Sequence, residues 1–380
     1  MPEDIDDANP LTIHDSRFTS SDSRFTTDVI IVGQGICGTF LSWYMWKAGL
    51  KVVVMDEHQP FSATKVASGV INPVTGRQVV TTWLAEDLMP FTWQVYQQIG
   101  KDIETNLISQ KNIIVFPPSE QMREAYDKRI GEANSYIENL PAKDASALAD
   151  IVFSFFGTAV IDPVWLIDLH TLLNGWRAIL QQQNMLRGEI FDEGQLVVND
   201  DAVTYKNITA KKIIFCNGVN SFSLPWWQNL PFVFNKGEAL IVDIPGLPAD
   251  NIYKVGNSTI VPWNKGLWWV GSSYENNFTD ALPTSIFKQK KLQELQMHLK
   301  LPVTVVDHIA SLRPAVAVER RPFVGFHPYF PSIGILNGMG TKGCSLAPYF
   351  AQQLTENLVT EKAIDPLADI QRFKRMLRPV

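Results

Sequence analysis

The residues whose types and spacing most clearly suggest chemistry form a glycine-rich turn near the start of the chain. The sequence Gly33-Gln34-Gly35-Ile36-Cys37-Gly38 follows the apolar run 28–32 and precedes a stretch of good helix formers, 39–48. In this setting the pattern indicates a dinucleotide pyrophosphate at a helix N-terminus, where free backbone N–H groups bind anions. Glycine permits the tight turn and the close approach of phosphate oxygens. We therefore assign five residues to this site: Gly33, Gly35, Ile36, Cys37 and Gly38.

A carboxylate follows at the end of the next apolar run, 51–55. Asp56 comes 23 residues after Gly33, where it can accept hydrogen bonds from both ribose hydroxyls and would repel a 2′-phosphate. The neighbouring Glu57 could take the same role. The pattern predicts the adenosine of FAD or NAD, and the alternative is a glycine-rich turn capped by a surface acid.

Two later segments favour FAD over NAD, because a flavin must be held along its whole length by segments distant in sequence. The first, 67–73, supplies small residues on which a flat ring could lie, and the second, 337–343, offers another helix N-terminus and a cation. A simple NAD dehydrogenase would leave the second segment unexplained. The residues assigned to the cofactor here are Ala67, Ser68, Gly69, Ile71, Gly338, Gly340, Thr341, Lys342 and Gly343, together with Gly218 after the apolar run 213–216.

These motifs occur in the chain in a recognisable order. Together with Asp162-Pro163, Lys236-Gly237-Glu238, Ser311-Leu312-Arg313-Pro314 and Leu346-Ala347-Pro348, they resemble the D-amino acid oxidase and glycine oxidase superfamily over residues 27–358. The segment Thr341-Lys342-Gly343 also resembles the C-terminal flavin domain of the tRNA-wobble-uridine modifying enzyme. The resemblance implies FAD-dependent oxidation of an amine or amino acid, with hydride transfer to flavin N5 and O2 or a carrier as electron acceptor.

The resemblance also implies roles for two cations. Arg313 would clamp the substrate carboxylate in a bidentate ion pair. Lys342 would lie near the pyrimidine edge of the isoalloxazine and stabilise the anionic reduced flavin. A structural role is the alternative for Arg313, since Arg320 and Arg321 lie nearby, and a solvated surface position is the alternative for Lys342.

Other features of the resemblance concern the substrate and the flavin linkage. Tyr253 and Tyr274 are candidates for the aromatic hydroxyls that some members place over the substrate. Covalently flavinylated members carry a cysteine shortly after the Leu-Arg-Pro segment, and the range 314–328 has none. We therefore expect noncovalent FAD.

Two other functions stay open at this stage. The chain could be a flavin dehydrogenase for a hydroxy acid or amino acid that feeds a quinone, which would turn over negligibly with oxygen alone. It could also be a catalytically silent FAD-binding module, which no amine would bleach.

The order of strand-like and helix-like segments that must position these residues predicts an α/β fold. It comprises a Rossmann-like FAD-binding domain and a second α+β substrate domain built on an antiparallel sheet. The first domain comprises 28–80, 150–222 and 322–380, and the second comprises 81–149 and 223–321. We expect 82–149 to be mostly helical, 232–270 to form antiparallel strands, and 285–301 to form a helix on that sheet. Residues 1–27 are interpreted as a disordered leader.

Composition narrows the range of partners. The net charge of −6 and scattered Lys and Arg argue against nucleic acid. The three cysteines and six histidines show neither disulfide nor metal-ligand spacing. The apolar runs are shorter than the roughly 20 residues that a transmembrane helix needs. We expect a cytoplasmic protein without metal, for which a homodimer is permitted but not required.

Overall fold

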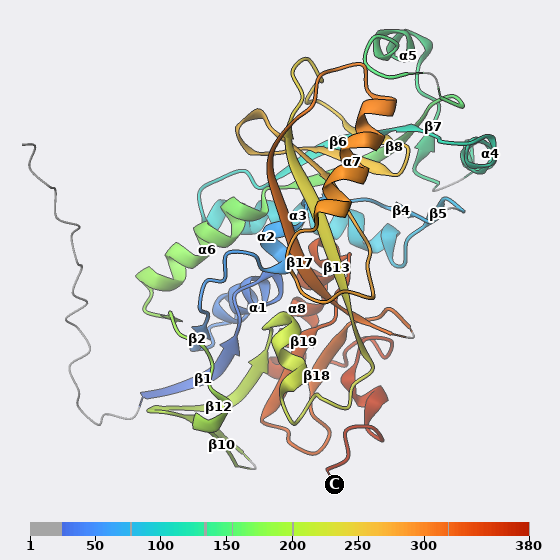
Figure 1. The fold of residues 1–380 in the computed structure, drawn as a ribbon. Helices are drawn as coiled ribbons and strands as arrows, with labels where there is room; N and C mark the ends of the chain where they lie inside the picture. The colour runs from blue at the N-terminus through green and yellow to red at the C-terminus, as the bar shows by residue number, and fades with distance from the viewer. Residues whose placement is uncertain are drawn as a thin grey trace, which may run out of the picture.

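The computed structural model describes residues 25–76, 78–132, 135–153, 155–199, 201–317 and 319–379. Residues 1–24 of the predicted leader lie outside this part of the chain, whereas its last residues belong to strand β1 (Phe25–Val32). Figure 1 shows a lower region that contains β1 and an upper region that contains the long strands β13 (Phe232–Asp243) and β17 (Thr304–Val316). Each region is built on one large sheet.

The first sheet has a parallel centre, in which β1 pairs with β2 (Val52–Met55) and β12 (Ile208–Phe215), and β12 pairs with β19 (Ile333–Asn337). Alternate residues of β1 face two separate apolar clusters. One contains α1 (Ile36–Lys47), α6 (Leu169–Gln182) and α8 (Gly343–Thr360), and the other surrounds Trp227. A strand covered on both faces must be apolar where it is covered, as residues 29–32 are. The other strands of this sheet are β9 (Leu186–Arg187), β10 (Leu196–Val198), β11 (Val203–Tyr205) and β18 (Phe323–Phe326).

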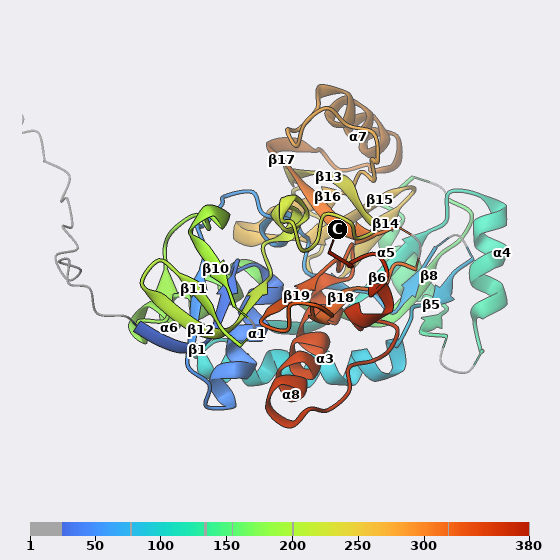
Figure 2. The same ribbon diagram turned by 90° about the horizontal axis from the view of Figure 1, so that it is seen from below.

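The second sheet is antiparallel within the described residues except where β6 (Ile108–Phe116) pairs with β14 (Ile252–Val255). Helix α7 (Ser285–His298) packs on one face, as Figure 2 shows, and α2 (Ala63–Val66) lies on the other. Besides β6, β13, β14 and β17, its strands are β16 (Trp268–Gly271), β15 (Ser258–Pro262), β8 (Ala159–Ile167), β7 (Ile137–Glu138) and β3 (Val70–Ile71). The two sheets confirm the predicted fold class.

The range 82–149 differs from its mostly helical expectation. It contains α3 (Ala85–Asp102), α4 (Glu120–Arg129) and α5 (Ala142–Leu148), but also β6 and β7. The first half of β6 is polar, so the chain lacks a clear strand pattern there, and pairing with β8 and β14 determines its conformation. Strands β3 and β8 also join the second sheet, although 28–80 and 150–222 were assigned to the first domain.

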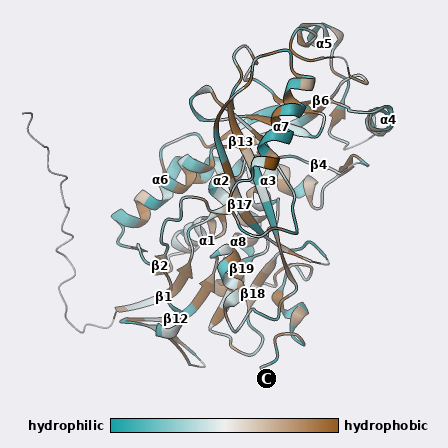
Figure 3. Cartoon of the chain, viewed as in Figure 1, coloured by the Kyte–Doolittle hydropathy of each residue, from teal (hydrophilic) through white to brown (hydrophobic). Residues whose placement is uncertain are grey.

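The hydropathy of each element agrees with its place in the fold, since the central strand β1 is covered on both faces and helix α7 lies on the outer face of the second sheet. Figure 3 shows β1 in the hydrophobic colour and much of α7 in the hydrophilic one. No helix among the described residues combines the length and apolar character needed to cross a bilayer. The remaining elements are β4 (Val74–Thr75), β5 (Val80–Thr81) and four short 3-10 helices, η1 (Glu193–Gln195), η2 (Gly218–Ser223), η3 (Asn264–Gly266) and η4 (Ile370–Phe373).

Candidate active site

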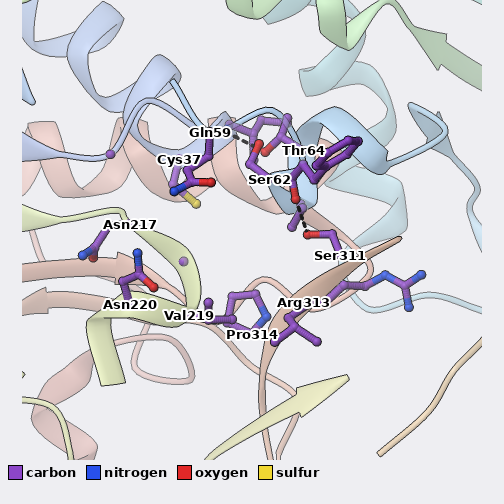
Figure 4. Close-up of a pocket in the computed structure, with 18 of the residues that line it drawn as sticks. Cys37, Gln59, Ser62, Thr64, Asn217, Val219, Asn220, Ser311, Arg313 and Pro314 are labelled. Atoms are coloured by element: carbon purple, nitrogen blue, oxygen red, sulfur yellow. Dashed lines mark hydrogen bonds between the residues drawn. The ribbon is translucent and has the colours of Figure 1, made fainter. Parts of the chain in front are cut away.

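A cavity of about 860 Å³ lies where the carboxyl ends of β1, β2, β12 and β19 meet strand β17 of the second sheet. This volume falls within the range of about 300–1,000 Å³ typical of small-molecule and cofactor sites. Figure 4 shows Cys37, Gln59, Ser62 and Thr64 along one wall and Asn217, Asn220 and Pro314 along the other. Thirteen of the predicted residues line it: Gly33, Gly35, Ile36, Cys37, Asp56, Glu57, Ala67, Ser68, Gly218, Arg313, Gly340, Thr341 and Gly343.

The glycine turn after β1 leaves no room for larger residues. A Cβ added to Gly33, whose φ is +96°, would lie 2.8 Å from the Cα of Asn217, and one added to Gly38 would lie 1.8 Å from the carbonyl oxygen of Gly33. Gly38 therefore serves packing and does not line the cavity. Gly35 is the N-cap of α1, so the first amides of that helix have no acceptor within the helix, and Ile36 and Cys37 of this first turn line the cavity. The amide of Ile36 donates to Thr64 Oγ1 at 3.0 Å.

Cys37 completes this turn with a neutral group. Burial raises the pKa of its thiol to about 12, so the side chain carries no negative charge near neutral pH. A thiolate here would repel a pyrophosphate bound to the same helix start. The turn thus combines free amides with an uncharged side chain, as an anion site requires.

Asp56 is held by three donors at the end of β2. Its Oδ2 accepts the amide of Gln34, and its Oδ1 accepts the amide of His58 and Nη1 of Arg177, each at 2.8 Å. The same Nη1 donates to the side chain of Gln34 at 2.9 Å. This network orients the carboxylate at the cavity edge, where Glu57 also lies.

Within the segment 67–73, the structure separates residues that line the cavity from residues that pack in the core. Ala67 and Ser68 line the cavity, whereas Gly69 and Ile71 do not. A Cβ on Gly69 would lie 2.1 Å from the carbonyl oxygen of Ile167, and Ile71 is buried in the core. Close contact with β8 therefore accounts for the glycine at position 69 and core packing accounts for Ile71, while their contact with the cofactor stays a prediction.

The second glycine segment behaves similarly. Gly340, Thr341 and Gly343 line the cavity at the start of α8, but Gly338 packs against Phe323, 3.0 Å from an added Cβ. Lys342 does not line the cavity, and its Nζ donates to the carbonyl oxygen of Asn72 at 3.2 Å. Burial lowers the pKa of Lys342 to about 8.

One end of the cavity is formed by strand β17 of the second sheet, and Arg313 lies at this end. Figure 4 shows its side chain leaving β17 on the side away from Asn217 and Asn220. Nη1 donates to Asn235 Oδ1 at 2.8 Å and to the carbonyl oxygen of Ser273 at 3.3 Å. No carboxylate of the described residues lies within 4.0 Å of it, and burial lowers its pKa. It is a partly buried cation without a charged partner in the described chain.

The guanidinium of Arg313 lies across Gly237 on the neighbouring strand. A Cβ on Gly237 would meet Nη2 at 1.6 Å and Cζ at 2.1 Å. Since successive strand residues face opposite sides of a sheet, Lys236 and Glu238 lie on the other face. There Glu238 Oε2 lies 2.9 Å from Nε2 of His308, and both its oxygens accept hydrogen bonds from Thr284. In the Lys-Gly-Glu motif, Gly237 thus leaves space for the guanidinium of Arg313, and the buried Glu238 holds Thr284 at the start of α7.

Other predicted side chains lie outside the cavity. Tyr253 is only 1% exposed, and its hydroxyl donates to the carbonyl oxygen of Pro248 within the core beneath α7. We correct this assignment, because Tyr253 lies on the face opposite Arg313. Tyr274 is 57% exposed and is not part of the cavity lining. Its electrostatic effect on the pKa of Arg313 is upward and smaller than the lowering by burial. Neither Arg320 nor Arg321 lines the cavity, and the guanidinium carbon of Arg321 lies 3.8 Å from the ring centroid of Trp83.

Sequence reasoning missed most of the lining residues in two loops of the cavity, in which it had assigned only Asp56, Glu57 and Gly218. Both loops follow parallel strands, the first after β2 and the second after β12, and ligands bind beside the carboxyl ends of such strands. This positional rule was the available signal. The missed lining residues in these loops include Gln59, Phe61, Ser62, Thr64, Asn217, Val219 and Asn220.

The described residues fit FAD on three grounds. The cavity is large and continuous from Asp56 to Arg313. One end has the glycine turn at the start of α1, in which Gly33 and Gly38 leave no space for a Cβ. A second helix start, that of α8, borders the same cavity from a remote part of the chain. A cofactor longer than a single nucleotide can therefore be held at both ends.

Comparisons with known proteins agree with this geometry. The FAD dependent oxidoreductase (DAO) family matches residues 28–357. The uncharacterized oxidoreductase YurR of Bacillus subtilis (strain 168) is 22% identical over 361 residues, covering 86% of this chain and 93% of that protein. Two solved structures have a similar fold: iminodiacetate oxidase from Chelativorans sp. BNC1 (TM-score 0.74, 20% identity, 89% of this chain and 97% of that chain) and glycine oxidase from Geobacillus kaustophilus (TM-score 0.74, 17% identity, 90% and 98%).

The family match confirms the resemblance based on the motifs, and it confirms FAD as the cofactor. The matched range includes both glycine segments and Arg313. The chain therefore belongs to the DAO family of FAD-dependent oxidoreductases.

Proposed function

We propose that the protein oxidises an amine or amino acid at the carbon next to nitrogen. FAD, when bound, supplies the two-electron acceptor at flavin N5. The substrate loses a hydride from carbon and a proton from nitrogen, and water converts the resulting imine to a carbonyl compound and a free amine. The observation that carries the proposal is Arg313, a partly buried cation with no carboxylate partner among the described residues, at the end of the FAD cavity. The names of the similar iminodiacetate and glycine oxidases support the same substrate class.

The proposed role of Arg313 is to bind a substrate carboxylate. Its Nη1 is already used by Asn235 and Ser273, but Nε and Nη2 have no acceptor in the described part of the chain. This free edge of the planar fork suits a bidentate carboxylate pair. Partial burial strengthens such a pair relative to one in water. Binding there would hold the carbon–hydrogen bond in a reactive position.

We propose that FAD is held without a covalent bond. The three cysteines, Cys37, Cys216 and Cys344, all line the cavity. Burial raises the pKa of Cys37 and Cys344 to about 12 and raises that of Cys216 well above its ordinary value, so none provides a thiolate near neutral pH. Acid precipitation should leave the yellow colour in solution, and flavin retained in the pellet would contradict the proposal.

The function is tested by visible spectroscopy of the purified protein. Anaerobic addition of amino acids and N-alkyl glycines should bleach the flavin with at least one of them. Arg313→Met should keep the yellow colour and raise the KM of that substrate steeply. Flavin that no amine bleaches would contradict amine oxidation and favour a silent FAD-binding module, whereas an unchanged KM in Arg313→Met would remove Arg313 from the site.

The electron acceptor is tested separately, by adding oxygen to the substrate-reduced protein. Rapid reoxidation with peroxide formation is expected for an oxidase. Slow reoxidation by oxygen and fast reoxidation by a soluble quinone would instead favour the dehydrogenase alternative.

A further inference from the structure

Asn235 holds the only side-chain acceptor that Arg313 uses among the described residues. The two residues are directly opposite each other on β13 and β17. Asn235 is 1% exposed, and its Oδ1 accepts from Nη1 of Arg313 at 2.8 Å. Its Nδ2 donates to Oδ1 of Asn276 at 3.2 Å, so the orientation of the amide is determined by a donor on one side and an acceptor on the other.

The chemistry of this contact matters because the acceptor is neutral. An amide oxygen orients a guanidinium without cancelling its charge, whereas a carboxylate at the same distance would form an internal ion pair. The other acceptor, the carbonyl oxygen of Ser273, is neutral as well. The charged side chains of Lys236 and Glu238 lie on the opposite face of the strand. The charge of Arg313, which lines the cavity, is therefore not cancelled by these contacts.

We propose that Asn235 is a positioning residue that makes Arg313 a receptor for the carboxylate of the substrate. Its side-chain oxygen accepts from Nη1 of Arg313 and leaves Nε and Nη2 of Arg313 for the ligand. Because this oxygen belongs to a neutral amide, it does not neutralise the positive charge of Arg313. This inference rests on the proposed function, because a substrate carboxylate is part of it.

The decisive variant is Asn235→Asp, which places a carboxylate beside Arg313 with almost no change in size. The probe is acetate, whose binding to the oxidised holoenzyme is followed by the change in flavin absorbance. Hydrogen bonds to charged groups are worth about 1.5–3 kcal/mol, so the Kd for acetate should rise on the order of ten- to a hundredfold. The KM of an amino acid substrate should rise similarly, with a much smaller change in kcat.

Two further variants separate charge from structure. Asn264→Asp makes the same substitution at an exposed position of η3 and should leave the acetate Kd unchanged. Asn235→Leu removes the acceptor without adding charge, so its Kd should lie between those of the native protein and Asn235→Asp. Bound FAD per chain checks that each variant is folded, and Asn235→Leu remains a test if the aspartate variant does not fold.

The outcomes distinguish this inference from the proposed function. Equal acetate affinity in the native protein and either Asn235 variant would overturn the inference, as would equal weakening in both variants. If acetate binds the native protein and is lost in Asn235→Asp, yet no amine bleaches the flavin, the carboxylate receptor stands and amine oxidation fails. If amines bleach the flavin but the native protein does not bind acetate, the inference fails and amine oxidation stands.

Discussion

The substitution Gly237→Ala should impair substrate binding without unfolding the protein. The added Cβ would lie 1.6 Å from Nη2, 2.1 Å from Cζ and 2.7 Å from Nη1 of Arg313, so the guanidinium must leave its position. These atoms are the far end of a flexible side chain, so the cost in stability should fall below the roughly 1–3 kcal/mol of rigid overpacking. Loss of a charge-assisted contact of about 1.5–3 kcal/mol predicts a rise in KM on the order of ten- to a hundredfold.

The assay is steady-state kinetics on the amine that bleaches the flavin, with urea unfolding as the measure of stability. Gly188→Ala is the matched control, because an added Cβ there meets nothing within 4 Å. In a double-mutant cycle, Gly237→Ala should add almost nothing to Arg313→Met, since the clash disappears with the guanidinium. Additive effects, or an unchanged KM in Gly237→Ala alone, would refute the assignment of Gly237 as the space for Arg313.

Three further predictions concern titration and cofactor affinity. Burial lowers the pKa of His327 to about 4 from its ordinary 6.5. As the pH falls from 6.5 to 4, the unfolded chain therefore binds a proton at this histidine while the folded chain does not. The free energy of unfolding should fall by up to about 3 kcal/mol over this range. His327→Asn should flatten that loss in urea unfolding at pH 7 and 4.5, and an equal loss in both proteins would contradict it. Arg177→Gln removes a partner of Asp56 and should raise the Kd of FAD about tenfold in a fluorescence titration, whereas unchanged affinity would show that Asp56 needs no such support. Burial lowers the pKa of Lys342 to about 8 from 10.5, so the stability of the FAD-free protein should rise with pH between these values. Lys342→Met should lack that rise, and parallel urea midpoints in the two proteins would argue against the lowered pKa.

Much of the cofactor site could be predicted because its signals are local. A tight turn, a helix start and a strand-end carboxylate depend on residues within about 30 positions, the length of one strand, helix, strand unit. The turn at Gly33 and the acid at Asp56 therefore lie where the spacing indicated. The missed strand β6 shows the opposite case, since its conformation depends on β8 and β14 from later in the chain.

The sequence by itself determined the α/β class, the position of the glycine turn after β1 and the family, since each depends on local spacing or on the order of short motifs. The tertiary structure alone decided which side chains reach the cavity. It buried Tyr253 beneath α7, and it brought Asn235, Gly237 and Arg313 together across β13 and β17. The physical reason is that strand register determines which face and which neighbour each side chain meets, and register depends on contacts between residues far apart in sequence.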